Sequence, residues 1–127
     1  RNNVVKKLPV NMENTGSVKN TVQENKIMNK QEYLLINLAE EAIEIAQMAI
    51  KTAQFGMDEV YQIQDKTNSE RLAGEITDLK AVIEMIEDHS GINLNLGREA
   101  MDKKKEKVNF YMGVCKNIGS LDKDVDS

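Results

Sequence analysis

The feature that most constrains the fold is the stretch from 33 to 51, YLLINLAEEAIEIAQMAIK. Apolar or small side chains recur three and four residues apart, around almost the whole circumference that a helix would present. Asn37 and Gln47 are its neutral polar residues, and its only charges up to position 50 are three glutamates. The pattern predicts a long helix over about 30–55, ended by Gly56, with little surface left for solvent.

The three glutamates of this helix, Glu40, Glu41 and Glu44, have no local cation. Residues three and four apart share a helix face, so Glu44 stands beside both Glu40 and Glu41. No lysine or arginine lies within four residues of any of them. Like charges at this spacing repel, and removing unpaired carboxylates from water is costly. The helix therefore needs a positive partner from elsewhere.

A second acid pair, Glu75 and Asp78, lies in the largely apolar stretch RLAGEITDLKAVIEMI. Their spacing puts both carboxylates on one face of a helix, and the residues four positions further on are Leu79 and Val82. If the two helices are antiparallel neighbours, the acids converge into a set of oxygen ligands that suits Mg²⁺ or Mn²⁺. From the residues alone, this metal site and a simpler interpretation, a solvated acidic stripe on ordinary helices, have about equal support.

Composition sets further bounds. A chain of 127 residues is long enough for one domain with a moderate core, and a net charge of −4 argues against wholesale nucleic-acid binding. The apolar content is mainly Ile, Leu, Val, Ala and Met, which favours an all-α fold over a β-sandwich. We expect no membrane span and no signal peptide, because no apolar run has the required length or flanks. A single histidine, His89, and a single cysteine, Cys115, exclude the usual zinc sites, and the lone thiol fits a reducing cytoplasm.

The pattern divides the chain into three segments. Residues 1–28 form a polar arm, which we expect to be mobile or to wrap a neighbouring subunit, with a short helix over about 17–27 as an alternative. Residues 29–116 form the helical domain. Residues 117–127 form a polar, acidic tail that we expect to be flexible.

Two more helices are expected within the helical domain. Thr67 and Glu70 have capping-box spacing and begin a helix over about 69–89, with Asn68 as an alternative cap. A third, basic helix is expected over about 96–116. Two of the three expected helices are apolar on nearly all sides, and a single chain has too few helices to cover both. We therefore infer a bundle that is completed in a homo-oligomer, either a dimer or a tetramer.

The acid motifs carry a family resemblance. Residues 40–44 read EExxE and residues 75–78 read ExxD, in that order and followed by a basic third helix. With the runs EEAIEIAQMAIKTAQFG, TNSERLAGEITDL and EAMDKKKEKVNFYM, they resemble the MazG-like superfamily of all-α nucleoside triphosphate pyrophosphohydrolases, in particular its phage-type, single-domain members. The resemblance covers about residues 30–113. The chain departs from the family in a longer gap between the acid motifs and in Gln54, where relatives have an arginine before Phe-Gly.

The resemblance implies a reaction and a ligand set. The family hydrolyses nucleoside triphosphates between the α and β phosphates to a nucleoside monophosphate and pyrophosphate, and a phage-encoded member acts in the host cytoplasm. The family's metal ligands correspond here to Glu41, Glu44, Glu75 and Asp78, which would hold Mg²⁺, or Mn²⁺, against the triphosphate. Glu40 and Glu41 are both candidates for orienting or deprotonating the attacking water.

A triphosphate also needs cations. Lys51 and Arg71 border the predicted acid cluster, and Lys104 and Lys107 are i, i+3 neighbours on the third helix. We expect these four residues to bind substrate, with Asn68 as a base or sugar contact. The alternatives are a solvated face for the lysines, a local ion pair for Arg71 and a purely structural cap for Asn68.

Two functions of other classes stay open. A di-iron carboxylate bundle also uses acids on facing helices, but it requires Glu-x-x-His motifs, and the residue three before His89 is Ile86. The main alternative to the enzyme is a non-catalytic module for helical oligomerisation or for nucleotide binding. Mg²⁺-dependent release of pyrophosphate separates the enzyme from such a module, and iron content tests the di-iron bundle.

Overall fold

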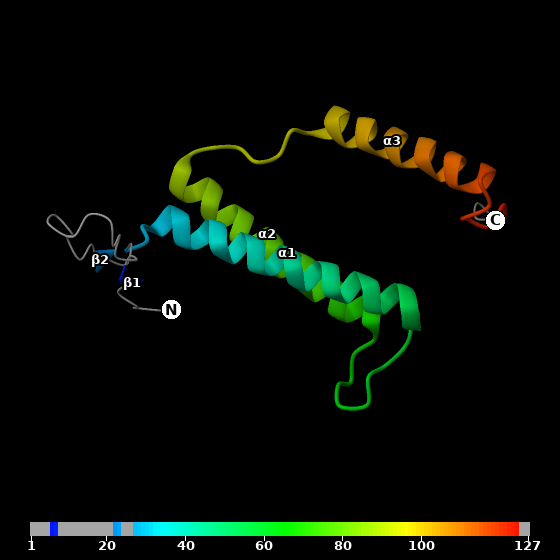
Figure 1. Ribbon diagram of the computed structural model, residues 1–127, viewed down its shortest axis with the longest axis horizontal. Helices are drawn as coiled ribbons and strands as arrows, with labels where there is room; N and C mark the ends of the chain where they lie inside the picture. Colours follow the sequence, from blue (N-terminus) through cyan, green and yellow to red (C-terminus); the bar gives the residue numbers. More distant parts are fainter. Residues whose placement is uncertain (1–5, 8–21, 24–26, 125–127) are drawn as a thin grey trace, which may run out of the picture. The chain divides into compact units, whose positions relative to one another are not determined.

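The computed structural model describes residues 6–7, 22–23 and 27–124, and its regular structure is almost wholly helical (Figure 1). In chain order the elements are β1 (Lys6–Lys7), β2 (Val22–Gln23), α1 (Lys30–Phe55), α2 (Asn68–Ser90) and α3 (Arg98–Asn117). The all-α fold class predicted from the sequence is confirmed. The chain divides into two compact units, Arg1–Val82 and Ile83–Ser127, and the boundary falls within α2.

The N-terminal segment contains a pair of two-residue strands. β1 and β2 are antiparallel, with Lys6 opposite Gln23 and Lys7 opposite Val22. The alternative of a short helix over 17–27 is therefore wrong at Val22–Gln23, where the β-branched valine lies in a strand, the conformation that β-branching favours. The remainder of that expectation lies mostly outside the described residues.

Helix α1 has the bounds that the sequence predicts, because both of its ends are capped. At its start the Asn29 side chain accepts a hydrogen bond of 2.8 Å from the Glu32 backbone N–H. At its end Gly56 has a backbone φ of 98°, a value that residues with a Cβ rarely adopt. The Gly56 N–H donates to the Thr52 carbonyl oxygen at 2.9 Å.

Helix α2 begins with the predicted capping box. The Glu70 N–H donates to the Thr67 hydroxyl oxygen at 3.2 Å, and the Thr67 N–H donates to the Glu70 carboxylate at 2.9 Å. The alternative cap, Asn68, is wrong: this residue is the first of the helix, and its side chain bonds the preceding loop.

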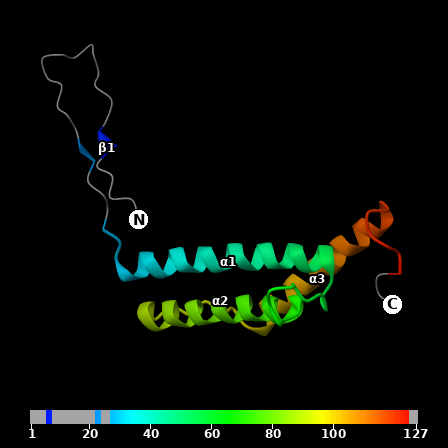
Figure 2. The same ribbon diagram turned by 90° about the horizontal axis from the view of Figure 1, so that it is seen from below.

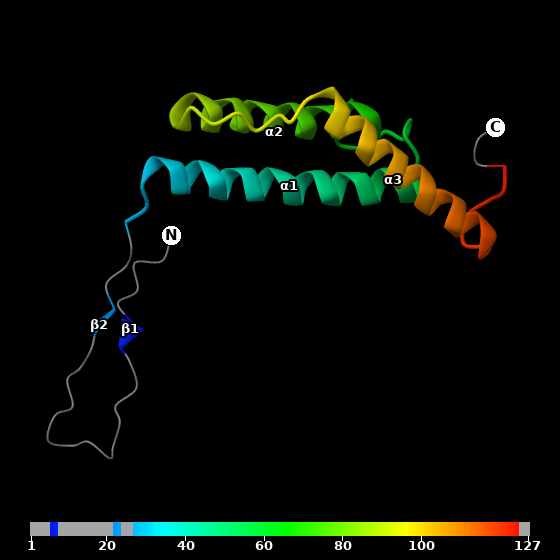
Figure 3. The ribbon, with the colours of Figure 1, turned by 90° about the horizontal axis from the view of Figure 1, so that it is seen from above.

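Helix α1 and the first part of α2 lie side by side and run in opposite directions (Figures 2 and 3). Leu34 and Met48 are buried on α1. Ile43 and Ile50 on the same helix are each 58% exposed. The apolar circumference of α1, which the sequence shows on nearly every side, is therefore covered only in part within one chain.

The second unit contains α3 and the turns that follow it. Gly97, with φ 89°, precedes the helix, and its N–H donates to the Asn95 side-chain oxygen at 2.8 Å, so α3 begins at Arg98 and not at position 96. After the helix, the N–H groups of Ser120 and Leu121 both donate to the Cys115 carbonyl oxygen. No helix among the described residues has the length and apolar character needed to cross a membrane.

Candidate metal centre

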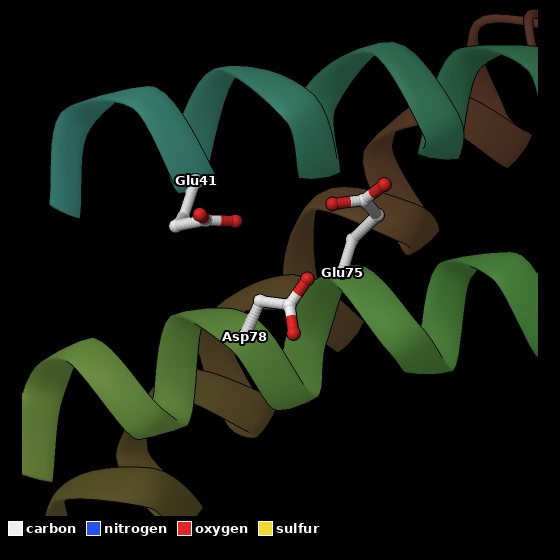
Figure 4. Close-up of side chains that lie close together, drawn as sticks. All are labelled: Glu41, Glu75 and Asp78. Carbon is white, nitrogen blue, oxygen red and sulfur yellow. The ribbon is translucent and has the colours of Figure 1, made fainter. Parts of the chain in front are cut away.

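Three carboxylates converge between α1 and α2. Glu41 projects from α1, and Glu75 and Asp78 project from α2, so that all three point into the space between the helices (Figure 4). One oxygen from each of the three lies within 4.8 Å of the others. The antiparallel arrangement produces this convergence, because each helix presents its acids on the face turned toward its partner. Three of the four predicted metal ligands are thereby brought together.

Glu44, the fourth predicted ligand, is exposed and lies one turn along α1 from Glu41. Its carboxyl is close enough to Glu41 and Glu75 to raise the pKa of both. Glu40, the neighbour of Glu41 in the chain, is also exposed, and its charge raises the pKa of Glu41 further. Both residues therefore border the three-carboxylate cluster rather than lying outside it.

Burial is the largest cause of the altered electrostatics. It raises the pKa of Glu41 above the ordinary 4.5, and the nearby charges of Glu44 and Asp78 add to the effect. Burial likewise raises the pKa of Glu75, with further contributions from Glu44, Asp78 and Glu41. Ionised carboxylates at this place repel one another and have lost part of their water, so a bound cation would favour the charged forms.

Two oxygen atoms of the cluster have no hydrogen-bond partner. Oε2 of Glu41 and Oε2 of Glu75 are both buried, and neither has a hydrogen-bond partner in the structure. Buried polar atoms in native proteins are nearly always paired, and a bound cation would satisfy two unpaired carboxylate oxygens on adjacent helices. Carboxylate oxygens are the donors that Mg²⁺ and Mn²⁺ prefer, and the residues present fit such an ion.

No described basic side chain neutralises the cluster. Arg98 pairs with Asp102 at 3.7 Å and Lys103 pairs with Glu99 at 3.2 Å, and all four residues belong to α3. The local excess of negative charge that the sequence shows around the two acid motifs therefore persists in the folded unit. In a solvated acidic stripe the carboxylate oxygens contact water, whereas here one oxygen each of Glu41 and Glu75 is buried and Asp78 is exposed.

The predicted substrate-binding residues occupy different environments. Lys51 is exposed in the last part of α1. Arg71 is half-buried on α2, and its guanidinium carbon lies 6.0 Å from the centre of the Tyr61 ring. Asn68 is 1% exposed and donates both to the Gly56 carbonyl oxygen and to the Glu59 carboxylate, each at 2.9 Å, so its amide is engaged in holding the loop between α1 and α2.

Lys104 and Lys107 belong to the second unit, whereas the acid cluster belongs to the first. Both lysines are exposed and lie at a cleft of about 520 Å³ beside the end of α3. The remaining lining residues are Val108, Tyr111, Met112, Cys115, Ser120 and Leu121. The structure thus gives these lysines a largely apolar neighbourhood of their own.

The sequence interpretation missed Tyr61, which is the aromatic residue beside Arg71. Nothing in the pattern of the loop 57–67 identifies this tyrosine, since the contact depends on how the loop folds back toward α2. Arg71 could be identified from the sequence, because it precedes Glu75 by four residues and Asp78 by seven and therefore shares their face of α2.

Comparisons of the chain with known protein families, with curated proteins and with solved structures find no match.

Proposed function

We propose that the chain is a Mg²⁺-dependent nucleoside triphosphate pyrophosphohydrolase of the MazG-like all-α type, acting on an NTP or dNTP in the cytoplasm. The observation that carries this proposal is the convergence of Glu41, Glu75 and Asp78 from antiparallel helices, with two buried carboxylate oxygens left unpaired. The order and spacing of the EExxE and ExxD motifs support the choice of reaction.

The acids would have two roles, holding the metal and activating the attacking water. Glu41, Glu44, Glu75 and Asp78 would hold the metal, which when bound supplies charge neutralisation of the phosphates and acidification of a bound water. We propose that either Glu40 or Glu41 orients that water or accepts its proton. Water adds across the anhydride bond between the α and β phosphates, and the products are a nucleoside monophosphate and pyrophosphate.

The proposal needs no covalent nucleophile from the protein. The half-buried Cys115 belongs to the second unit, whereas the acid cluster belongs to the first. Two hydroxyl residues of the first unit have structural roles: Thr52 donates to the Met48 carbonyl oxygen, and Thr67 caps α2. The four negative charges of a triphosphate are instead met by the metal and by cations. Lys51 and Arg71 are the basic residues of the first unit that we propose for this role.

We also propose that the catalytic form is a homo-oligomer, a dimer or a tetramer. The exposed apolar residues of α1 support this, because Ile43 and Ile50 lie on the helix that carries Glu41 and Glu44 and are each 58% exposed. Burial of such residues against a second copy would remove apolar surface from water and fix the helix that holds the acids.

The experiment that tests the function is a panel of canonical and modified NTPs and dNTPs, incubated with the protein and Mg²⁺ and assayed separately for pyrophosphate and orthophosphate. We expect pyrophosphate from at least one substrate, none in the presence of a chelator and none with Glu75→Gln. Orthophosphate as the only product would contradict the assigned bond. Nucleotide binding without any product would favour the non-catalytic module.

A further inference from the structure

The loop 57–67, between α1 and α2, is held in one conformation by a buried amide. Asn68 is 1% exposed, and its side-chain nitrogen donates to the Gly56 carbonyl oxygen and to the Glu59 carboxylate. Its backbone N–H donates to the Glu59 carbonyl oxygen at 2.9 Å. A buried polar residue that is bonded in this way favours one arrangement of the chain around it.

The same loop turns apolar side chains toward solvent. Tyr61 is 53% exposed and Ile63 is 83% exposed, although the bridge between Val60 and Thr67 and the bond from the Gln64 N–H to the Tyr61 carbonyl oxygen order the segment between them. Loops that are positioned by a rigid scaffold and that display aromatic residues are common binding elements. The bonded loop thus leaves the Tyr61 ring accessible to a ligand.

Arg71 connects this loop to the acid cluster. Its guanidinium carbon is 6.0 Å from the centre of the Tyr61 ring, within the range of a cation–π contact. Because Arg71, Glu75 and Asp78 are four and three residues apart, they form one row along α2. A helix rises 1.5 Å per residue, so Arg71 is only about 6 Å along the axis from Glu75. The row on α2 thus runs from the two carboxylates to the Arg71 cation, and the Tyr61 ring of the loop lies beside that cation.

We propose that Tyr61 is the platform on which the base of the nucleotide stacks, and that Arg71 bridges the base and the phosphates. This inference rests on the proposed function, since it takes the acid cluster as the place where a metal holds the triphosphate. A nucleotide carries the same order of groups as the row on the protein: anionic phosphates, then a sugar, then a flat aromatic base. Stacking on an aromatic side chain accepts any base, and Tyr61 would therefore bind the nucleoside while leaving the phosphates to the acids and cations.

The proposal is tested by calorimetric titration with Mg²⁺ present and with two probes. One probe is a nucleoside triphosphate whose α and β phosphates are joined by a methylene group, and the other is inorganic tripolyphosphate, which has no base. Tyr61→Ala should weaken binding of the nucleotide about tenfold or more, the loss expected for one stacked base, and should leave the affinity for tripolyphosphate unchanged. Tyr61→Trp should keep the nucleotide affinity or increase it.

The matched control is Tyr33→Ala, which removes an equally large exposed tyrosine from the first turns of α1, outside the loop. This variant should bind both probes as the wild type does, and the melting temperature and mass of each variant are measured alongside. Equal loss of both probes in Tyr61→Ala, loss that accompanies a change in oligomeric mass, or no loss at all would overturn the role of Tyr61 while the metal site stands. Failure of the wild type to bind either probe would overturn the proposed function and this inference together.

Discussion

Glu41 on α1 and Glu75 on α2 each have one carboxylate oxygen buried without a hydrogen-bond partner, and together with Asp78 they place oxygens within 4.8 Å of one another. The two acids come from motifs 34 positions apart in the sequence, so only the pairing of the helices brings them together. Repulsion at this place opposes folding unless a cation is present.

Glu44→Gln keeps the size of the side chain and removes one charge beside Glu41 and Glu75. We expect this change to abolish pyrophosphate release, because it weakens capture of the metal. In metal-free protein it should leave the melting temperature unchanged or raise it, since it relieves repulsion. A melting temperature below that of the wild type in the presence of a chelator would instead show that Glu44 is a structural acid paired with a lysine.

The raised pKa of Glu75 gives metal-free stability a definite dependence on pH. The folded protein holds the Glu75 proton more tightly than the unfolded chain, whose glutamates have the ordinary pKa of 4.5. The free energy of unfolding should therefore fall as the pH rises from 4.5 through the folded pKa. Urea denaturation in chelator, with Glu75→Gln as the reference, should show the wild type losing stability relative to this variant across that interval. A difference that is constant or that grows in favour of the wild type would contradict the desolvated cluster.

Asn68→Ala removes the side-chain nitrogen that makes both bonds to the loop, and it leaves the Gly56 carbonyl oxygen and the Glu59 carboxylate without this donor. Unpaired buried groups of this kind cost roughly 1–3 kcal/mol of unfolding free energy. Thr67→Ala, which removes the adjacent helix cap and a hydroxyl contact with Ser69, should cost about 1 kcal/mol and serves as the comparison. Urea midpoints measure both. An Asn68→Ala protein that is fully stable yet fails to bind nucleotide would show that Asn68 contacts the substrate directly.

Particular residues show how far the sequence could go. The bounds of α1 follow from a helical repeat bracketed by Asn29 and Gly56, and the start of α2 follows from the Thr67 and Glu70 spacing, because these signals act over a few residues. The pairing of acids on each helix is equally local. The sequence predicts that the acids of the two helices converge only if these helices are antiparallel neighbours, because convergence depends on which helix faces meet.

The features that the sequence did not reveal are contacts between distant positions. The sequence around Asn68 indicates a cap or a substrate contact, because nothing local shows that its amide reaches Gly56, twelve residues earlier. The Tyr61 and Arg71 contact has the same origin, as it depends on the path of a loop. The β2 strand at Val22–Gln23 pairs with Lys6–Lys7, and that partner could not be identified from weak apolar spacing alone.

Self-association is expected from the exposed apolar residues of α1. Sedimentation at micromolar concentration should give a mass of at least two chains, and Ile43→Asp, which places a charge on a side chain now 58% exposed, should lower that mass. The substitution adds no charge to a buried position of the single chain, so the variant should remain helical by circular dichroism. A monodisperse wild-type monomer that still releases pyrophosphate would contradict the role given to the oligomer.

The most direct test of the metal centre is the melting temperature of the wild type with millimolar Mg²⁺ and with chelator. An ion that binds the folded cluster and not the unfolded chain should stabilise it by about 2.7 kcal/mol at a free concentration of about 100 Kd, which corresponds to a rise of several degrees. Glu84→Gln, which removes an exposed acid of α2 outside the cluster, should show the same rise, and Glu75→Gln should lose most of it. A wild-type melting temperature that Mg²⁺ does not change, or a rise that persists fully in Glu75→Gln, would contradict the assignment of these carboxylates as metal ligands.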